Sequence, residues 1–583
     1  MSESRSYDEE EEREDDESGS QYEEYSEEDN YQGEESSTQN NHALNLKWAL
    51  GFNYELPDGA HNLTNDNRKE IFYIAGHTGV IYDYENRTQR LLQGHCNKIT
   101  SCSFCPERNI IITADNGPSS LLVVWDVTTG TPLKTIFDPH PQGVECLDVT
   151  EDGQLIATLS RERENESKTN IYSQTVSIWK WDDADANPCH STGVLNSTNT
   201  TSNPDSPIDY QNFIRFNQWK KNEFVTTGKR SVRFWSNTES GGTSTSYSPM
   251  GPAKEASHNK EFTQTVFIPK STQAVTGTMD GLLVVWDISL IMEDYSAPDQ
   301  RREIKTINLL NTSHKTDAKK NAITILKAHK DLLIIGSSNG SVRFYDHQFR
   351  IVSWFEDFGL SKITSISLSN EYFDYEITQK ITKENEYDFR YPDFIVVDSN
   401  AKIVLLKTEL FQEVERDKKK GNVLVESIVK PIVSISARPN SSILGIACAN
   451  GHVYQWNFLT KDAVLTTLKT FGTDTPNCLQ YSPDGKYLVV ATTQGNIFVY
   501  NVEKKKWQQT VLQISLKKKG IKGNYITFSE NSVSFAIMDD QCCVSLYKLG
   551  HKYDDVSQPI EWVFCGKLRS HCSNVTGINF GES

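Results

Sequence analysis

The sequence contains no run of about 18 or more apolar residues, which a helix needs in order to cross a bilayer. Its first residues are acidic and lack the basic and apolar segments of a secretory signal peptide. Eleven cysteines in 583 residues are few, and their number is odd. Several lie in apolar, strand-like segments, where a free thiol behaves as a small apolar side chain. We therefore expect an intracellular protein of a reducing compartment with no membrane segment.

A basic excess is also missing, since 59 basic side chains face 78 acidic ones and the net charge is −19. Residues 1–42 hold 17 acidic side chains and two arginines, a net charge of −15, so the remaining residues carry only −4. A body so nearly balanced argues against a general nucleic-acid binder. The acidic tail is predicted to be disordered, because its few aliphatic side chains cannot offset the entropy lost on ordering.

Short segments along the chain repeat one pattern, in which a glycine in a tight turn precedes an aromatic strand residue by five positions. DGLLVVWD (Asp280 to Asp287) is its clearest copy. The pairs in this register are Gly281/Trp286, Gly340/Tyr345, Gly451/Trp456, Gly495/Tyr500 and Gly79/Tyr84. The aromatic position, or a leucine in its place, recurs without the glycine at Trp125, Trp179, Trp235, Leu406 and Tyr547. An aspartate follows it at Asp126, Asp287 and Asp346.

These ten positions lie 41 to 61 residues apart, which is the period of a four-stranded propeller blade with its loops. Upstream of them, pairs of apolar runs are joined by turn residues, as in VECLDVTEDGQLIATLS (Val144 to Ser160). We therefore predict an all-β protein: a disordered tail over residues 1–42, a seven-bladed β-propeller over 43–410, and a partial second propeller over 411–583. The boundary between the propellers is expected near the charged residues 415–421.

One further pattern leads to a family. Gly94-His95 precedes Trp125-Asp126 by about 30 residues, as in the GH…WD unit of WD-repeat proteins, which the chain resembles.

The chain also resembles, more narrowly, the cilia- and flagella-associated WD-repeat proteins of the calmodulin- and spoke-associated complex at radial spokes. The resemblance runs from about Leu44 to the end and is carried by LKWALGFN (Leu46 to Asn53), AGHTGVIYDY (Ala75 to Tyr84), LLQGHCNKITS (Leu91 to Ser101), ITADNGPSSLLVVWD (Ile112 to Asp126), VRFYDHQFRIVSWF (Val342 to Phe355) and LRSHCSNVTGINFG (Leu568 to Gly581). It implies a non-enzymatic scaffold of the ciliary axoneme whose loss impairs beating. The implied partners are radial-spoke-base proteins and subunits of the calmodulin-associated complex, with no nucleic acid or membrane.

The family pattern continues through the rest of a second propeller to a calcium-binding-type region, whereas this sequence ends at Ser583. Residues 568–583 repeat the opening of a blade, as residues 91–101 do. Three blades and the start of a fourth cannot close a ring, so we expect the second propeller to be completed by further sequence or by another chain.

The motifs of catalysis and metal binding are weak. Cys102 and Cys105 form a CxxC with no second pair, so zinc is not expected. The loop that starts at Asp183 begins like a calcium loop, but Pro188 stands where glycine is required. No phosphate-binding loop or nucleophile elbow occurs. We therefore expect no catalysis, no cofactor and no metal.

Residues 504–519 (KKKWQQTVLQISLKKK) suit a calmodulin target, because Trp507, Val511 and Ile514 lie on one face of a helix between two lysine triplets. The same residues also suit the next strand of a propeller. Two alternatives to the ciliary scaffold remain open: a cytoplasmic microtubule-associated tandem propeller, and a propeller enzyme or nuclear assembly factor that uses its acidic tail to bind histones.

Overall fold

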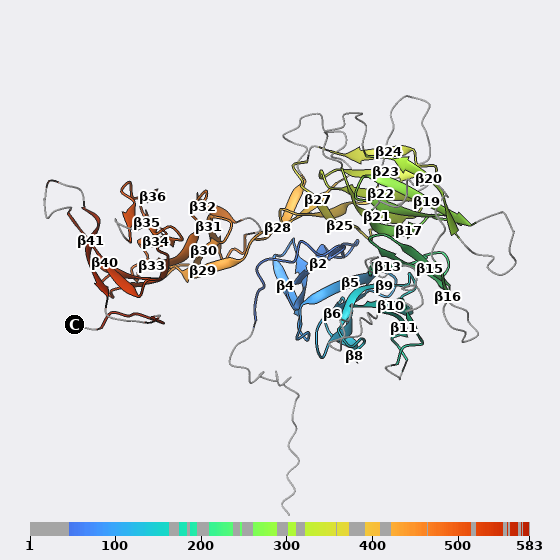
Figure 1. The fold of residues 1–583 in the computed structure, drawn as a ribbon, viewed down its shortest axis with the longest axis horizontal. Coiled ribbons are helices and arrows are strands. Elements are labelled where there is room, and N and C mark those ends of the chain that lie inside the picture. Colours follow the sequence, from blue (N-terminus) through green and yellow to red (C-terminus); the bar gives the residue numbers. More distant parts are fainter. Residues whose placement is uncertain are drawn as a thin grey trace, which may run out of the picture. The chain divides into compact units, whose positions relative to one another are not determined.

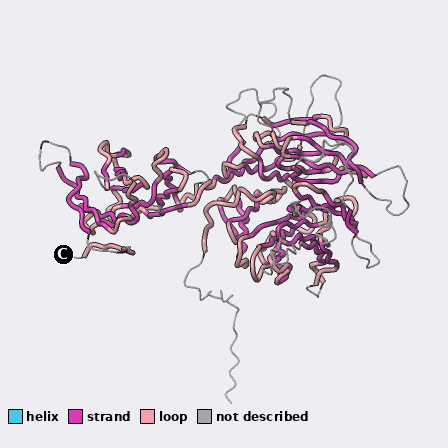
Figure 2. Tube along the Cα trace, in the orientation of Figure 1, coloured by secondary structure: helices cyan, strands magenta, loops and turns pink. Residues whose placement is uncertain are grey.

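The computed structural model consists of strands, turns and loops, and it contains no helix in the residues that it describes (Figure 2). These residues are 46–161, 174–183, 187–194, 209–236, 245–247, 261–288, 301–310, 321–356, 358–371, 391–407, 421–462, 465–514, 520–551, 557, 560–569, 573 and 575–581. The predicted acidic tail lies outside them. The all-β fold class predicted from the sequence is confirmed.

Ten antiparallel sheets follow one another along the described chain; each contains four consecutive strands, and the ninth along the chain has a fifth. The first three sheets contain β1 (Ala60–Asn62), β2 (Glu70–Ala75), β3 (Thr78–Asp83), β4 (Thr88–Leu92); β5 (Ile99–Cys105), β6 (Ile110–Asp115), β7 (Leu121–Asp126), β8 (Pro132–Phe137); and β9 (Val144–Val149), β10 (Leu155–Ser160), β11 (Thr175–Lys180), β12 (His190–Gly193). The next two contain β13 (Gln211–Phe216), β14 (Glu223–Gly228), β15 (Val232–Ser236), β16 (Thr245–Tyr247); and β17 (Phe262–Phe267), β18 (Ala274–Thr278), β19 (Leu282–Ile288), β20 (Arg301–Asn308).

The sixth and seventh sheets contain β21 (Ile323–His329), β22 (Leu332–Ser337), β23 (Val342–Asp346), β24 (Ile351–Phe355); and β25 (Ile363–Leu368), β26 (Phe394–Asp398), β27 (Lys402–Leu406), β28 (Asn422–Glu426). The last three contain β29 (Ile432–Ala437), β30 (Ile443–Cys448), β31 (His452–Asn457), β32 (Thr466–Thr470); β33 (Pro476–Tyr481), β34 (Tyr487–Thr492), β35 (Asn496–Asn501), β36 (Lys506–Trp507), with β37 (Leu512–Gln513) also on β35; and β38 (Gly523–Phe528), β39 (Ser534–Asp539), β40 (Cys543–His551), β41 (Ile560–Arg569).

The first seven sheets form what we call the seven-sheet ring, coloured from blue to light orange in Figure 1. The first strand of each sheet contacts the first strand of a neighbouring sheet, and β1 contacts β25 of the seventh. Two hydrogen bonds join these last two strands: the Asn62 N–H donates to Ser367 Oγ at 2.9 Å, and the Ser365 hydroxyl donates to the Ala60 carbonyl at 3.0 Å. The first strands therefore lie at the centre of the ring.

Burial follows strand position within a sheet. All six residues of β6 (IIITAD) are buried, because this second strand is covered on both faces by the neighbouring sheets. A strand buried on both faces is expected to show a continuous apolar run rather than alternation. The fourth strands lie at the outer edge and are more polar, as β20 (RREIKTIN) shows. The distribution of apolar residues thus sets the order of strands from centre to edge.

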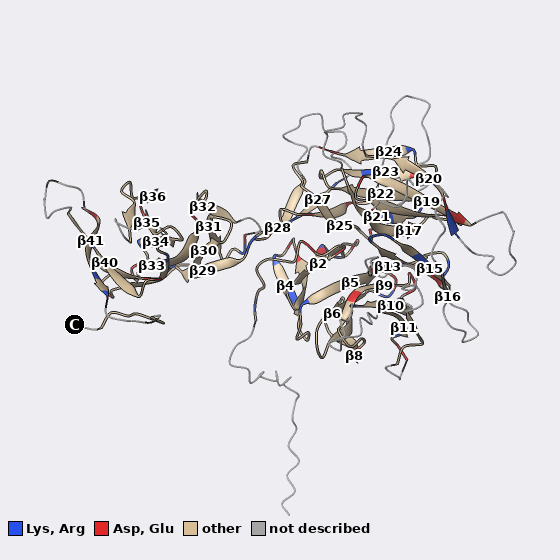
Figure 3. Cartoon of the chain, viewed as in Figure 1, with Lys and Arg blue, Asp and Glu red and all other residues tan. Residues whose placement is uncertain are grey.

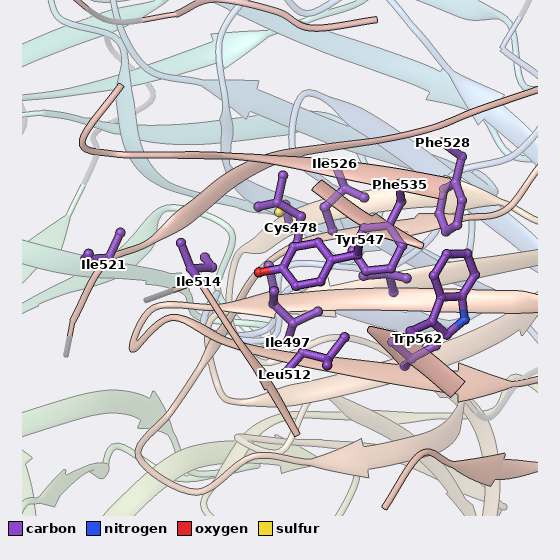
Figure 4. Close-up of a cluster of buried hydrophobic side chains, with 14 residues drawn as sticks. Cys478, Ile497, Leu512, Ile514, Ile521, Ile526, Phe528, Phe535, Tyr547 and Trp562 are labelled. Carbon is purple, nitrogen blue, oxygen red and sulfur yellow. The ribbon is translucent and has the colours of Figure 1, made fainter. Parts of the chain in front are cut away.

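The last three sheets, from β29 to β41, form what we call the three-sheet set. Side chains of its second and third sheets share one buried cluster, which includes Phe535, Tyr547 and Trp562 (Figure 4). The rings of Phe535 and Tyr547 stack with their centres 4.8 Å apart. The ring of Trp562 in this tenth sheet also lies 5.4 Å from that of Tyr487 in the ninth, so aromatic packing between successive sheets stabilises this part of the chain.

The structure differs from the expected boundary between the two propellers. Strand β28 pairs with β27 in the seventh sheet, with Val425 opposite Ile403. A boundary that keeps this sheet whole falls after Glu426, not near residues 415–421. In the sequence, residues 415–421 fall between β27 and β28, the third and fourth strands of this sheet. The division into a seven-bladed and a partial propeller remains a prediction.

The predicted opening of an eleventh unit is not seen as a strand. Leu568 and Arg569 end β41, the fourth strand of the tenth sheet, and residues 575–581 form no strand. In the sequence, Ser570-His571 follow β41 as Gly94-His95 follow β4. The start of an eleventh unit therefore stays a prediction.

Candidate functional site: repeat residues and the polar centre of the ring

Four tryptophans of the repeat share one hydrogen bond. Each lies on the third strand of its sheet and donates its indole N–H to a threonine hydroxyl on the second strand. The Nε1–Oγ1 distances are 2.8 Å for Trp125–Thr113, 2.7 Å for Trp179–Thr158, 3.0 Å for Trp235–Thr226 and 2.7 Å for Trp286–Thr276. A buried indole N–H normally has such a partner. The aromatic position of the repeat therefore joins neighbouring strands as well as filling the core.

Gly94-His95 and Trp125 meet through Thr113. His95 Nε2 lies 2.7 Å from Thr113 Oγ1, and His95 Nδ1 lies 2.9 Å from Asp115 Oδ2. The whole chain of bonds is satisfied when Trp125 donates to Thr113, Thr113 donates to Nε2, and Nδ1–H donates to Asp115. The two ends of the GH…WD unit are thus brought together in the second sheet, where the side chains of His95 and Asp115 are fully buried.

Five further repeat residues, Tyr345, Leu406, Trp456, Tyr500 and Tyr547, also lie on third strands. The side chains of Tyr345, Leu406 and Tyr547 are buried there, Trp456 donates to the Asp462 carbonyl at 3.1 Å, and Tyr500 packs 5.0 Å from Trp507. The aspartates that follow them order turns: Asp126 accepts from the Thr129 N–H at 2.7 Å, Asp346 from the Arg350 N–H at 2.8 Å, and Asp287 from the Thr272 hydroxyl at 2.6 Å.

The turn glycines adopt the backbone conformation that favours glycine, with φ of +75° at Gly281, +86° at Gly340, +85° at Gly451 and +87° at Gly495. The pair Gly79/Tyr84 does not fit this register. Gly79 lies inside β3, and Tyr84 follows the end of that strand. The turn glycine of the first sheet is Gly76, with φ of +67°, and the aromatic that matches is Tyr82, opposite Ile71 and followed by Asp83. The turn before β3 has only two residues, so the fixed spacing of five does not apply.

A charged cluster that the repeat pattern did not predict lies at the centre of the seven-sheet ring. Asp58 Oδ2 is 2.8 Å from Arg215 Nη2, and Asp58 Oδ1 is 3.0 Å from Lys327 Nζ. Arg215 Nη1 is 3.6 Å from Asp148 Oδ1, and Asp148 also accepts from the Phe216 N–H at 2.8 Å. Asp148, Arg215 and Lys327 come from three different first strands, and Asp58 precedes β1. The cluster therefore links sheets across the centre.

Burial and the neighbouring cations shift the pKa values of the two carboxyl groups in this cluster. Burial alone would raise the pKa of Asp58, but the charges of Lys327 and Arg215 hold that pKa below its ordinary value. Burial raises the pKa of Asp148, against the attraction of Arg215. Two carboxylates and two cations are thus placed for mutual neutralisation. Figure 3 likewise shows acidic and basic residues interspersed along the strands.

His61 and Cys102 lie beside this cluster, with His61 Nε2 3.5 Å from Cys102 Sγ. Burial, together with the charge of Lys327, lowers the pKa of His61 to about 3. Burial raises the pKa of the Cys102 thiol. Both groups are therefore neutral at physiological pH, whereas a nucleophilic cysteine needs a thiolate. Cys105, the other half of the CxxC, faces the Glu151 carbonyl instead.

The cluster borders a cavity of about 340 Å³, lined also by Gln264 and Thr263.

Within the described ranges, no three His, Cys, Asp or Glu side chains gather as metal ligands. No helix in the described residues is long and apolar enough to cross a membrane. Sequence reasoning missed the cluster because its members are far apart in the sequence, and neither QNFIRF around Arg215 nor ITILKAH around Lys327 identifies the partner of its cation.

The basic segment 504–519 is extended where the structure describes it. Residues 506–507 and 512–513 form β36 and β37, which both pair with β35. Leu512 and Ile514 are buried, and Trp507 packs against Tyr500. The segment forms the outer strand of the ninth sheet rather than the first strand of the next one. A calmodulin-type helix would require these residues to leave the sheet.

The comparisons with known proteins agree with this architecture. A family model described as the CFAP251 N-terminal domain matches residues 44–411, and a WD domain, G-beta repeat model matches residues 464–501. The chain belongs to the CFAP251 family. Family membership places it among cilia- and flagella-associated WD-repeat proteins.

Relatives with the name cilia- and flagella-associated protein 251 match the chain over most of its length. The chain is 49% identical to that of Tetrahymena thermophila over 97% of its length, 31% identical to that of Chlamydomonas reinhardtii over 93%, and 26% identical to that of Pongo abelii over 92%. The matches cover 56%, 64% and 44% of these relatives, so the chain spans about half their length.

Proposed function

We propose that the chain is a non-enzymatic structural scaffold of the axoneme in motile cilia and flagella, positioned at the base of a radial spoke. The observation that carries this proposal is the 49% identity to the Tetrahymena thermophila protein over 97% of the chain. Its proposed partners are spoke-base proteins and subunits of the calmodulin-associated complex.

A scaffold role is supported by how the polar residues of the ring are used. His95, Thr113 and Asp115 bind one another and Trp125, and Asp58, Asp148, Arg215 and Lys327 form mutual ion pairs. Groups that pair with one another in this way stabilise a rigid body, whose surface loops are then available to partners. We assign no calmodulin contact to residues 504–519, because Leu512 and Ile514 are buried in a sheet.

The proposal is tested by tagging the endogenous protein and deleting its gene in a ciliated cell. We expect the tagged protein along the axoneme, and we expect deletion to impair beating while cilia still assemble. Cryo-tomography of the mutant should show a spoke or its base missing.

Intact spokes in the mutant would reject the spoke-base assignment. A tagged protein on cytoplasmic microtubules would favour the tandem-propeller alternative, and one in the nucleus would favour an assembly factor. Turnover of a nucleotide by the purified protein would contradict the non-enzymatic role.

A further inference from the structure

Three aromatic rings of the three-sheet set surround one lysine ammonium. Lys469 lies on β32, and its Nζ is 4.2 Å from the ring centre of Phe498, 4.8 Å from that of Trp507 and 5.3 Å from that of Phe471. A cation within about 6 Å of an aromatic face is attracted by the ring quadrupole. Each of the three rings meets this condition. We call these rings the 469 cage.

The cage is fixed by its own packing. Phe471 is buried, and its ring centre is 4.9 Å from Phe498 and 6.2 Å from Trp507, with both pairs edge to face. Trp507 also packs against Tyr500, with the centres of the two rings 5.0 Å apart. Phe498 and Trp507 belong to the ninth sheet, whereas Lys469 and Phe471 belong to the eighth and the chain that follows it. The ammonium therefore sits at the contact between two sheets.

In the part of the chain that the structure describes, the Lys469 ammonium has aromatic neighbours but no anionic partner. Among the described residues it forms no ion pair and no hydrogen bond to an acceptor. An unmodified ammonium carries three N–H donors and is strongly hydrated, whereas the aromatic faces around it offer no carbonyl, carboxylate or hydroxyl acceptor. Burial also lowers the pKa of Lys469, as expected for a cation that is partly removed from water.

We propose that Lys469 is a site of N-methylation and that the 469 cage holds the methylated ammonium. Methylation keeps the positive charge and replaces N–H donors by methyl groups, which need no acceptor. An aromatic cage is the surrounding that proteins use to bind quaternary ammonium groups, methyl-lysine included. The cage thus matches the product of methylation better than the unmodified side chain.

The chemistry requires a methyl-sulfonium donor, delivered by a lysine methyltransferase. The lone pair of the neutral amine attacks the methyl carbon of the donor, and an N–C bond forms as the C–S bond breaks. The sulfur leaves with the bonding electron pair as a neutral thioether, and a proton passes from the nitrogen to water. The lowered pKa of Lys469 increases the fraction of neutral amine that this step needs.

The position of Lys469 allows an enzyme to reach it. Strand β32 is the outer strand of its sheet, so one of its edges is unpaired within that sheet. Its neighbours Thr466, Thr467 and Thr470 are exposed, and Lys469 itself is only partly buried. Rotation of the side chain out of the cage exposes the amine for methyl transfer, and rotation back places the methyl groups against the rings.

The first test is mass spectrometry of the full-length protein, purified through an affinity tag from the cells that naturally make it. We expect most peptides that contain Lys469 to carry one, two or three added methyl groups. Lys305 is the matched control, since it contacts a single ring, Phe349, at 5.0 Å and is exposed. It should be unmethylated. An unmodified Lys469 at full peptide coverage, or equal methylation of Lys305, would overturn the proposal.

A second test compares recombinant protein that has lysine or genetically encoded trimethyl-lysine at position 469. Trimethylation should raise the midpoint of thermal unfolding by about 2 °C or more. Trp507→Leu should abolish this difference, because it removes one wall of the cage. A midpoint that is lowered or unchanged by trimethylation would contradict the cage. Neither test rests on the proposed ciliary function.

Discussion

Buried histidines link the stability of the seven-sheet ring to pH. His140 Nε2 lies 2.9 Å from Thr158 Oγ1, and His140 Nδ1 lies 3.2 Å from Thr175 Oγ1. Two neutral hydroxyl groups therefore contact the imidazole of His140. Burial lowers the pKa of His140 to about 4. The same cause lowers the pKa of His329 to about 4 and that of His61 to about 3. All three imidazoles are therefore neutral in the folded protein above these values.

Acidification should destabilise the ring through these side chains. An unfolded histidine has a pKa of about 6.5, so between pH 6.5 and 4 the unfolded chain binds protons that the folded one does not, and stability falls as pH falls. At pH 5 the loss is about 2 kcal/mol for His140 alone, from 1.5 pKa units at about 1.4 kcal/mol each. Urea unfolding measures the free energy of unfolding at pH 7.5 and at pH 5.0. Between these two pH values, this free energy should fall by about 2 kcal/mol less in His140→Gln than in the wild type.

Exposed His77 provides the matched control for this measurement. His77→Gln should keep the full wild-type dependence on pH. If the free energy of unfolding falls equally in the wild type and in His140→Gln, His140 is not kept neutral by burial.

At the scale of elements, glycine is needed for two separate reasons, as Gly340 in the turn between β22 and β23 and Gly359 in the connection between β24 and β25 show. Gly340 has φ of +86°, and a Cβ there would lie 2.1 Å from the Leu360 carbonyl oxygen. Gly359 has φ of +71°, but a Cβ there would meet nothing within 4 Å. The two positions thus separate backbone strain from steric contact.

Gly340→Ala should destabilise the protein more than Gly359→Ala. Both variants incur about 1 kcal/mol for a left-handed alanine, and Gly340→Ala adds about 2 kcal/mol because backbone must move away from the new methyl group. Chemical denaturation of the two variants, followed by tryptophan fluorescence, measures the difference. If both variants lose the same free energy of unfolding, the backbone around Gly340 accommodates the new methyl group without a further loss of stability.

The register of these turns was predictable because it depends on local spacing. A turn of fixed length places Gly281, Gly340, Gly451 and Gly495 five positions before the strand aromatic, and the structure has them there. The first sheet departs from this rule because its turn is shorter, so the matching residues are Gly76 and Tyr82 rather than Gly79 and Tyr84. Spacing alone does not reveal the length of a turn.

The central charged cluster could not be predicted in the same way. Asp58, Arg215 and Lys327 are far apart in the sequence and meet only because the ring brings first strands together. A single lysine or arginine in an apolar strand does indicate a buried cation that needs a partner, but it does not identify that partner. The 469 cage likewise joins strands of two sheets, and no spacing within one repeat encodes it.

At the scale of the whole molecule, the seven-sheet ring depends on the contact between its first and seventh sheets. Each sheet is built from four consecutive strands, so no strand is shared between the two ends of the ring. Closure relies instead on hydrogen bonds such as Asn62–Ser367 and on one apolar cluster that contains Tyr73, Tyr82, Ile403 and Leu424. Leu424 lies on β28, beyond the boundary expected from the sequence.

The ring should therefore need β28 in order to be stable. We expect a fragment of residues 43–430 to fold and resist proteolysis, and a fragment of residues 43–410 to unfold at a temperature lower by about 5 °C. The shorter fragment loses the buried Leu424 and leaves β27 without its outer partner, and such a loss of core burial costs about 2–5 kcal/mol. A fragment of residues 43–421 separates the effect of the strand from that of the connection before it, and should behave like 43–410. If all three fragments unfold at the same temperature, β28 is not part of the cooperative unit, and the boundary near residues 415–421 is the correct one.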